Sequence, residues 1–110
     1  MNLEISLNEL LKQGKIKKQA ADRQYLDGLL AAAHRNFQAA QAVISRFNET
    51  AFKAAYDGLL QLSRAIMLIN GYRPDDGGQH HTAFLVAGMF LGEKLQPLIK
   101  RLDHYRRIRN

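Results

Sequence analysis

Apolar residues recur every three or four positions along most of this chain, the spacing that places them on one face of a helix. A first short helix is predicted from a capping pattern at Ser6 and Glu9, and it should end near Gly14. A long helix is predicted to follow Asp22, a suitable cap, and to reach a turn at residues 47–50. Its apolar face comprises Leu26, Leu29, Leu30, Ala33, Phe37, Ala40, Ile44 and Phe47.

A third helix is predicted after that turn, with Asn48 or Thr50 as its cap. It should end at Asn70 and Gly71, where glycine permits a left-handed stop. Its apolar face comprises Phe52, Ala55, Leu59, Leu62, Ile66 and Ile69. Because the connection between the two long helices is short, they are predicted to form an antiparallel hairpin.

The remainder of the chain is predicted to add a loop and further helices. Residues 15–22 look like a connector, and residues 72–79 contain proline, aspartate and glycine residues that favour a turn. The apolar run at residues 83–91 predicts a short helix buried on nearly all sides, with a buried strand as the alternative. A last helix is predicted from Glu93, with Pro97 in its first turn.

These elements predict an all-α fold, an up-and-down bundle of four to five helices with a long antiparallel hairpin. The length suits one domain over residues 1–110, with an N-terminal arm at 1–19 and a core bundle at 20–110.

Composition narrows the class of protein. A hydrophobic fraction of 46% with 24% charged residues is typical of globular proteins and excludes a disordered chain. The absence of cysteine excludes a disulfide framework and a thiolate metal site. We find neither a leader segment nor an apolar run long enough to span a bilayer, so we expect a cytoplasmic protein without a membrane partner. The net charge of +6 favours polyanionic partners, nucleic acid before membrane surfaces.

Conventional catalytic and metal-binding patterns are missing. His80 and His81 are adjacent at a predicted helix start, so their side chains diverge by about 100° and lack the spacing of a helical zinc site. We expect one of them to pack or hydrogen-bond near the loop, and we predict no metal and no cofactor. No serine has the sequence context of an acyl-transfer nucleophile.

Two polar helix faces remain as candidates. On the third helix Asp57 and Arg64 share a face with Lys53 and Gln61, and this face is either solvated surface or the lining of a polar cleft. On the last helix a basic face is either solvated surface or a nucleic-acid contact, and it comprises Lys100, His104 and Arg107.

Arg109 continues the apolar stripe of the last helix, which comprises Leu95, Leu98, Leu102 and Tyr105. A guanidinium directed to the apolar side needs an acidic group, a phosphate or a cleft between subunits as its partner. The alternative is that the helix end frays and Arg109 extends into water.

Three stretches carry a resemblance to a known family: LLAAAHRNFQAAQAVI, then AFKAAYDGLLQLSRAIMLINGYRPDDGGQHHTAF, then RLDHYRRIRN. Over residues 20–110 this order resembles the HEPN domain family, named for nucleotide-binding in higher eukaryotes and prokaryotes. The most informative part is an Ala-Tyr-Asp helix leading into a glycine-rich loop and a helix start with histidine. The lead-in LLKQGKIKKQAAD resembles the N-terminal arm of small bacterial members.

The resemblance implies a helical bundle that is commonly a homodimer, and many members are metal-independent ribonucleases. Some are toxins of toxin–antitoxin pairs, often beside a small nucleotidyltransferase partner. Their signature is an arginine, usually a polar residue, and a histidine a few positions later, all in the dimer cleft. Arg109 and Asn110 match its start and are therefore the candidate catalytic residues. The histidine is expected after Asn110, although several small members have tyrosine in that region, so we expect a truncated chain that is catalytically poor or silent.

Two functions are therefore predicted, a ribonuclease or toxin component that acts on RNA, and a non-catalytic helical module that dimerises and binds a nucleotide or a partner protein. The candidate cleft or binding residues are Tyr56, Asp57, Arg64 and His81. A DNA-binding helix-turn-helix is disfavoured, because no short recognition helix begins with base-reading side chains.

Overall fold

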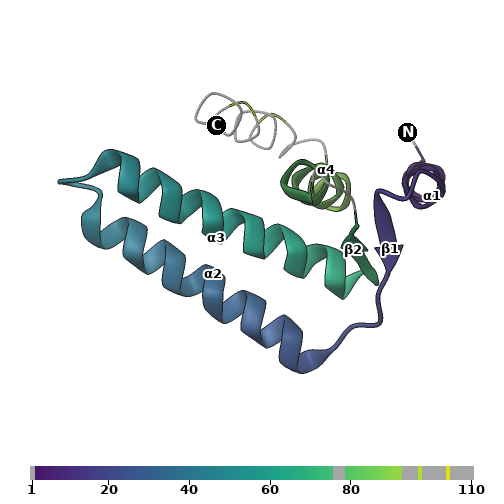
Figure 1. Ribbon diagram of the computed structural model, residues 1–110, viewed down its shortest axis with the longest axis horizontal. Helices are drawn as coiled ribbons and strands as arrows, with labels where there is room; N and C mark the ends of the chain where they lie inside the picture. Colours follow the sequence, from purple (N-terminus) through teal and green to yellow (C-terminus); the bar gives the residue numbers. More distant parts are fainter. Residues whose placement is uncertain (1, 76–78, 93–96, 98–103, 105–110) are drawn as a thin grey trace.

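Two long helices, α2 (Arg23–Val43) and α3 (Asn48–Ile69), lie side by side and run antiparallel, as the sequence predicts (Figure 1). The computed structural model describes residues 2–75, 79–92, 97 and 104. Within these residues the other elements are α1 (Leu3–Lys12), β1 (Ile16–Lys18), β2 (Tyr72–Pro74) and α4 (Gln79–Leu91). The predicted helical bundle with a long hairpin is thus confirmed.

Helix α1 begins earlier than its predicted cap. The side chain of Asn2 accepts hydrogen bonds from the backbone N–H groups of Glu4 (2.9 Å) and Ile5 (3.4 Å). Ser6 lies inside the helix, where its own N–H donates to the Asn2 carbonyl, so the predicted capping box is wrong. Asn2 satisfies the first free N–H groups of the helix, and asparagine is at least as good a cap as serine.

Asp22 caps α2 as predicted, accepting hydrogen bonds from the N–H groups of Gln24 (2.9 Å) and Tyr25 (3.5 Å). The helix ends at Val43, earlier than its apolar pattern suggests. As a consequence Ile44 and Phe47 lie beyond its end and are 59% and 58% exposed.

Helix α3 has no side-chain cap, and the predicted caps at Asn48 and Thr50 are wrong because both residues already lie within the helix. Its predicted end is confirmed, since Gly71 adopts a φ of 90°. The carbonyl of Gly71 accepts a hydrogen bond from the N–H of Gln19 (2.8 Å), which joins the segment before α2 to the end of α3.

Helix α3 occupies the centre of the molecule, between α2 on one side and α4 on the other (Figure 1). Its predicted apolar face is only half-buried, and Ile69 is exposed. The positions with the greatest burial lie elsewhere around the helix: Ala51, Gly58, Leu60, Ser63, Ala65, Met67 and Leu68. The apolar pattern assumed a single buried face, whereas α3 is covered by α2 on one side and by α4 on the other, so the pattern did not identify the most buried positions.

Helices α2 and α3 pack closely at Gly58. A Cβ atom placed on this glycine would lie 2.9 Å from Cε1 of Phe37, so the phenyl ring of α2 packs directly on the backbone of α3. Farther along the pair, Asn36 of α2 donates a hydrogen bond to Gln61 of α3 (2.8 Å).

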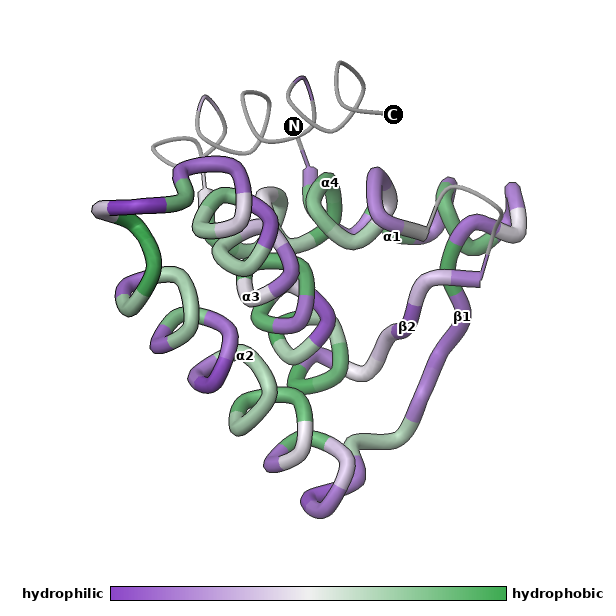
Figure 2. Tube along the Cα trace, turned by 60° about the vertical axis from the view of Figure 1, so that its left-hand side comes forward, coloured by the Kyte–Doolittle hydropathy of each residue, from purple (hydrophilic) through white to green (hydrophobic). Residues whose placement is uncertain are grey.

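The core forms where α4 packs on α3 and α1. Phe84 and Val86 of α4 are buried against Met67, and Leu10 of α1 joins the same cluster. Figure 2 shows α4 as predominantly hydrophobic along its trace. The prediction of a short buried helix at residues 83–91 is confirmed for most of its length, and the strand alternative is wrong.

A two-stranded antiparallel ribbon lies where the sequence predicts only a connector and a loop. Ile16 pairs with Pro74, Lys17 with Arg73, and Lys18 with Tyr72. The ribbon buries Ile16 in the core and brings β2 close to residues 19–25. No helix in the described part of the chain has the length and apolar character needed to cross a bilayer.

Candidate functional site

Four candidate residues, Lys100, Arg107, Arg109 and Asn110, lie outside the described residues. Of the predicted basic face, His104 is described, and it is helical and exposed. The other candidates come from α3 and α4.

Tyr56 of α3 contacts the start of α4. Its hydroxyl lies 3.4 Å from Nδ1 of His80, and its ring meets the ring of Phe84 edge-on at 5.3 Å between centroids. His80 therefore hydrogen-bonds beside the loop, and both His80 and His81 are exposed on α4. The contact joins residues that are 24 positions apart in the sequence.

Asp57 and Arg64 occupy different surroundings on α3. Both side chains are half-buried, and Asp57 precedes Arg64 by about two turns. Arg64 lines a pocket, and Asp57 is not among the residues that line it.

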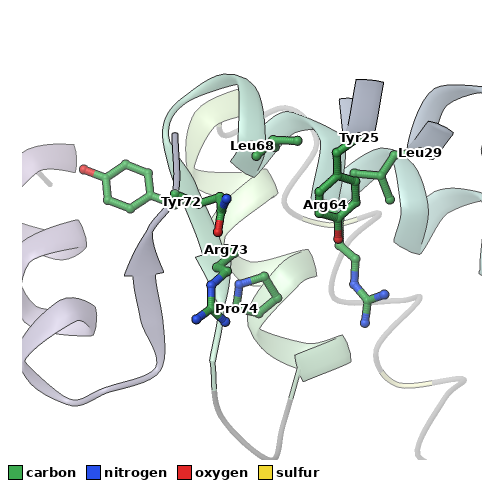
Figure 3. Close-up of a pocket in the computed structure, with 8 residues that line it drawn as sticks. Tyr25, Leu29, Arg64, Leu68, Tyr72, Arg73 and Pro74 are labelled. Carbon is green, nitrogen blue, oxygen red and sulfur yellow. The ribbon is translucent and has the colours of Figure 1, made fainter. Parts of the chain in front are cut away.

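The pocket lies between the start of α2, the end of α3 and β2, and has a volume of about 190 Å³. Figure 3 shows Arg64, Tyr25 and Leu29 coming from the two long helices, and Arg73 and Pro74 coming from β2. The complete lining is Gln19, Tyr25, Leu29, Arg64, Leu68, Tyr72, Arg73 and Pro74. Of these lining residues, only Arg64 is predicted from the sequence as a site residue. The other polar residues belong to segments that the sequence assigns to a connector, a helix start and a loop.

Arg64 has an unsatisfied donor. Its Nε atom is buried and has no hydrogen-bond partner in the structure that is described. The side chains of the neighbouring lining residues Leu29 and Leu68 are apolar and contain no acceptor atom, and no hydrogen bond joins Nε to the polar lining residues Gln19 and Tyr25. A buried donor on a charged group without a partner costs free energy, so this guanidinium suits a ligand with acceptor oxygens.

Arg73 belongs to a charge cluster on the β1–β2 ribbon. Its Nη1 donates to Oδ1 of Asp75 (2.9 Å), and Nζ of Lys17 lies 3.1 Å from Oδ2 of the same carboxylate. The hydrogen bond from Lys17, followed by that from Arg73, holds the pKa of Asp75 below its usual value of 3.8. Lys17 and Arg73 are paired across the ribbon, so their side chains lie on the same face.

Asp75→Asn is expected to lower the thermal unfolding midpoint slightly at pH 7, because the uncharged amide loses both ion pairs. The carboxyl has a lower pKa in the folded chain than in the unfolded chain, so its contribution exists above its unfolded pKa and disappears as the pH falls through its folded pKa. Circular dichroism melts should therefore show a difference between Asp75→Asn and the wild type at pH 7 that narrows below about pH 4. A difference of constant size across this range would contradict the proposed ion pairs.

Among the described residues, no group of three or more histidine, aspartate or glutamate side chains is arranged to hold a metal ion. Comparisons with models of protein families, with curated proteins and with solved structures find no match to this chain.

Proposed function

We propose that this chain is a HEPN-like helical domain that acts on RNA. The resemblance is concentrated in residues 54–84, where an Ala-Tyr-Asp helix is followed by a glycine-rich loop and a pair of histidines. The observation that carries the proposal is the contact between Tyr56 and His80, because it joins the two ends of this segment across the loop. The net charge of +6 supports a polyanionic substrate.

In the proposed mechanism Arg109 and Asn110 bind the scissile phosphodiester. A guanidinium can donate two parallel hydrogen bonds to phosphate oxygens, and it stabilises the negative charge that develops during cleavage. In the family signature a histidine acts as the general base that removes the proton of the ribose 2′-hydroxyl. Arg109 and Asn110 match the first two positions of that signature, so we expect RNA binding by this chain to depend on them.

We propose further that the chain forms a homodimer, in which Arg109 would lie in the cleft between the two copies. A nucleotidyltransferase or an antitoxin is proposed as a further partner. Light scattering of the purified chain should give about twice the monomer mass of 12.5 kDa. A mass of one chain at every concentration would contradict the shared cleft.

Arg109→Ala is expected to weaken binding of a fluorescent structured RNA about tenfold in an anisotropy titration, because it removes charge-assisted hydrogen bonds to phosphate. The matched control is Arg35→Ala, which removes the same charge from an exposed position on α2 and should have a much smaller effect. Equal losses in the two variants would show binding by net charge alone and would contradict a specific role for Arg109.

A second candidate is a non-catalytic module that binds a partner protein. It is favoured by Ile44 and Phe47, which place two large apolar side chains in contact with solvent at the α2–α3 turn. RNA cleavage that depends on Arg109 would support the first candidate. A dimer lost in Phe47→Ser, without any RNA binding, would support the second.

A further inference from the structure

The pocket lined by Arg64 and Arg73 has the properties of an anion site. The buried Nε of Arg64 has no acceptor in the described structure, and apolar Leu29 and Leu68 make up part of the surrounding wall. A ligand oxygen in the pocket would supply the acceptor that the protein lacks. We propose that this pocket binds the phosphoryl group of a small phosphomonoester, an inference that does not depend on the RNA-directed function.

The charges around the pocket fit a dianion. Among the described residues, Arg64 and Arg73 line it and Lys17 is joined to Arg73 through Asp75, so these four side chains together carry two positive charges in excess. A phosphomonoester carries roughly −1.5 to −2 at pH 7, whereas a simple carboxylate carries about −1. A guanidinium has five N–H donors, so Arg73 retains donors for a ligand while one of its nitrogens contacts Asp75.

The anion site is made by side chains and not by the N-terminus of α2. Asp22 already accepts hydrogen bonds from the N–H groups of Gln24 and Tyr25 at that end of the helix. Arg64 and Arg73 are the cationic side chains among the residues that line the pocket, so they are the charged groups available to a phosphoryl group.

The size of the pocket limits the ligand. Its volume of 190 Å³ is smaller than that of pockets for drug-sized ligands, which are about 300 Å³ or larger. The pocket thus holds a phosphoryl group and a few attached atoms, and the remainder of the ligand must extend past its rim.

Tyr25 is the aromatic residue available at that rim, because its side chain is 52% exposed. The ring of Tyr72 is already packed, with its centroid 6.3 Å from that of Phe90, and in Figure 3 it turns away from Arg64. A sugar or a base attached to the phosphate can lie against the ring of Tyr25.

The test is isothermal titration calorimetry of the full chain with inorganic phosphate, ribose 5-phosphate and adenosine monophosphate, each at low and high salt. Arg64→Met keeps the length and apolar stem of the side chain, and it should weaken binding of ribose 5-phosphate about 10- to 100-fold by removing charge-assisted hydrogen bonds. Arg64→Lys keeps the charge without the planar fork and should give a smaller but measurable loss. The control Arg35→Met, at an exposed position on α2, should bind as the wild type does.

A folding readout accompanies each titration. Because the Nε of Arg64 is buried without a partner, Arg64→Met should unfold at the same temperature as the wild type or higher, so lost binding would not reflect lost structure. Stronger binding of adenosine monophosphate than of ribose 5-phosphate, abolished in Tyr25→Ala, would support a nucleotide as the source of the phosphate. Equal binding of the two would support recognition of the phosphoryl group alone.

Three results would overturn the inference: no binding of any of the phosphates, equal affinity in Arg64→Met and the wild type, or acetate binding as tightly as the phosphomonoesters.

Discussion

Phe84→Ala is expected to lower the free energy of unfolding by about 3–5 kcal/mol, the largest effect of a single substitution that we predict. The Phe84 side chain is 1% exposed and belongs to the buried cluster that joins α4 to Ile16 and Met67. Its ring also meets Tyr56 edge-on, an interaction that alanine cannot make. A domain of this size is stabilised by only about 5–15 kcal/mol, so the variant would retain a small margin at best.

Urea unfolding followed by circular dichroism at 222 nm measures this loss. The matched control is Leu91→Ala, which truncates a large apolar side chain on the same helix at a position that is 44% exposed. Leu91→Ala should lower the free energy of unfolding much less, because truncation of an exposed side chain leaves a smaller cavity and loses less buried area. Similar losses in the two variants would contradict the placement of the core around Phe84.

Gly58→Val is expected to lower the free energy of unfolding by about 1–3 kcal/mol, the cost of overpacking at a close helix contact. A Cβ atom at this position would lie 2.9 to 3.1 Å from three carbon atoms of the Phe37 ring, and valine adds two further methyl groups. The ring would have to move out of the α2–α3 contact, or the two helices would have to separate.

Gly28→Val is the control for helix propensity, since it makes the same change within α2 where a Cβ atom has no neighbour within 4 Å. Valine is a better helix former than glycine, so Gly28→Val should leave stability unchanged or raise it. The combination of Gly58→Val with Phe37→Leu should recover part of the loss, and this coupling is measured by a double-mutant cycle. If Gly58→Val and Gly28→Val have the same effect, then the contact with Phe37 does not limit the packing of the hairpin.

Local signals in the sequence predicted the helices well. The apolar spacing located α2 and α3, and an uninterrupted apolar run located α4. Asp22 and Gly71 were correctly assigned to a helix start and a helix end. These features depend on neighbouring residues alone. At α1 both Asn2 and Ser6 are residues that favour the N-cap position. Asn2 takes this position, and the helix is one turn longer than it would be with Ser6 as its cap.

The ribbon and the pocket depend on contacts between distant segments, so no local pattern predicts them. Each strand has three residues, too few to establish an alternating pattern, and β1 contains two lysines. The pocket combines residues from three segments, 19–29, 64–68 and 72–74, that meet only in the folded chain. The helical phase of Arg64 was compatible with a solvated face or with a polar cleft shared with Asp57, and the lack of a hydrogen-bond partner at its Nε depends on its tertiary neighbours.

The β1–β2 ribbon makes the first 19 residues part of the smallest segment that can fold. From the sequence, the first 19 residues were assigned to an arm outside the core bundle. In the structure Leu7 and Ile16 are buried in the hydrophobic core, and Gln19 forms part of the pocket wall. Excision of this segment would uncover Met67 and Phe84 and would open the cavity beside Arg73. The arm is therefore an integral layer of the bundle, and any shortened version or domain fusion has to keep it.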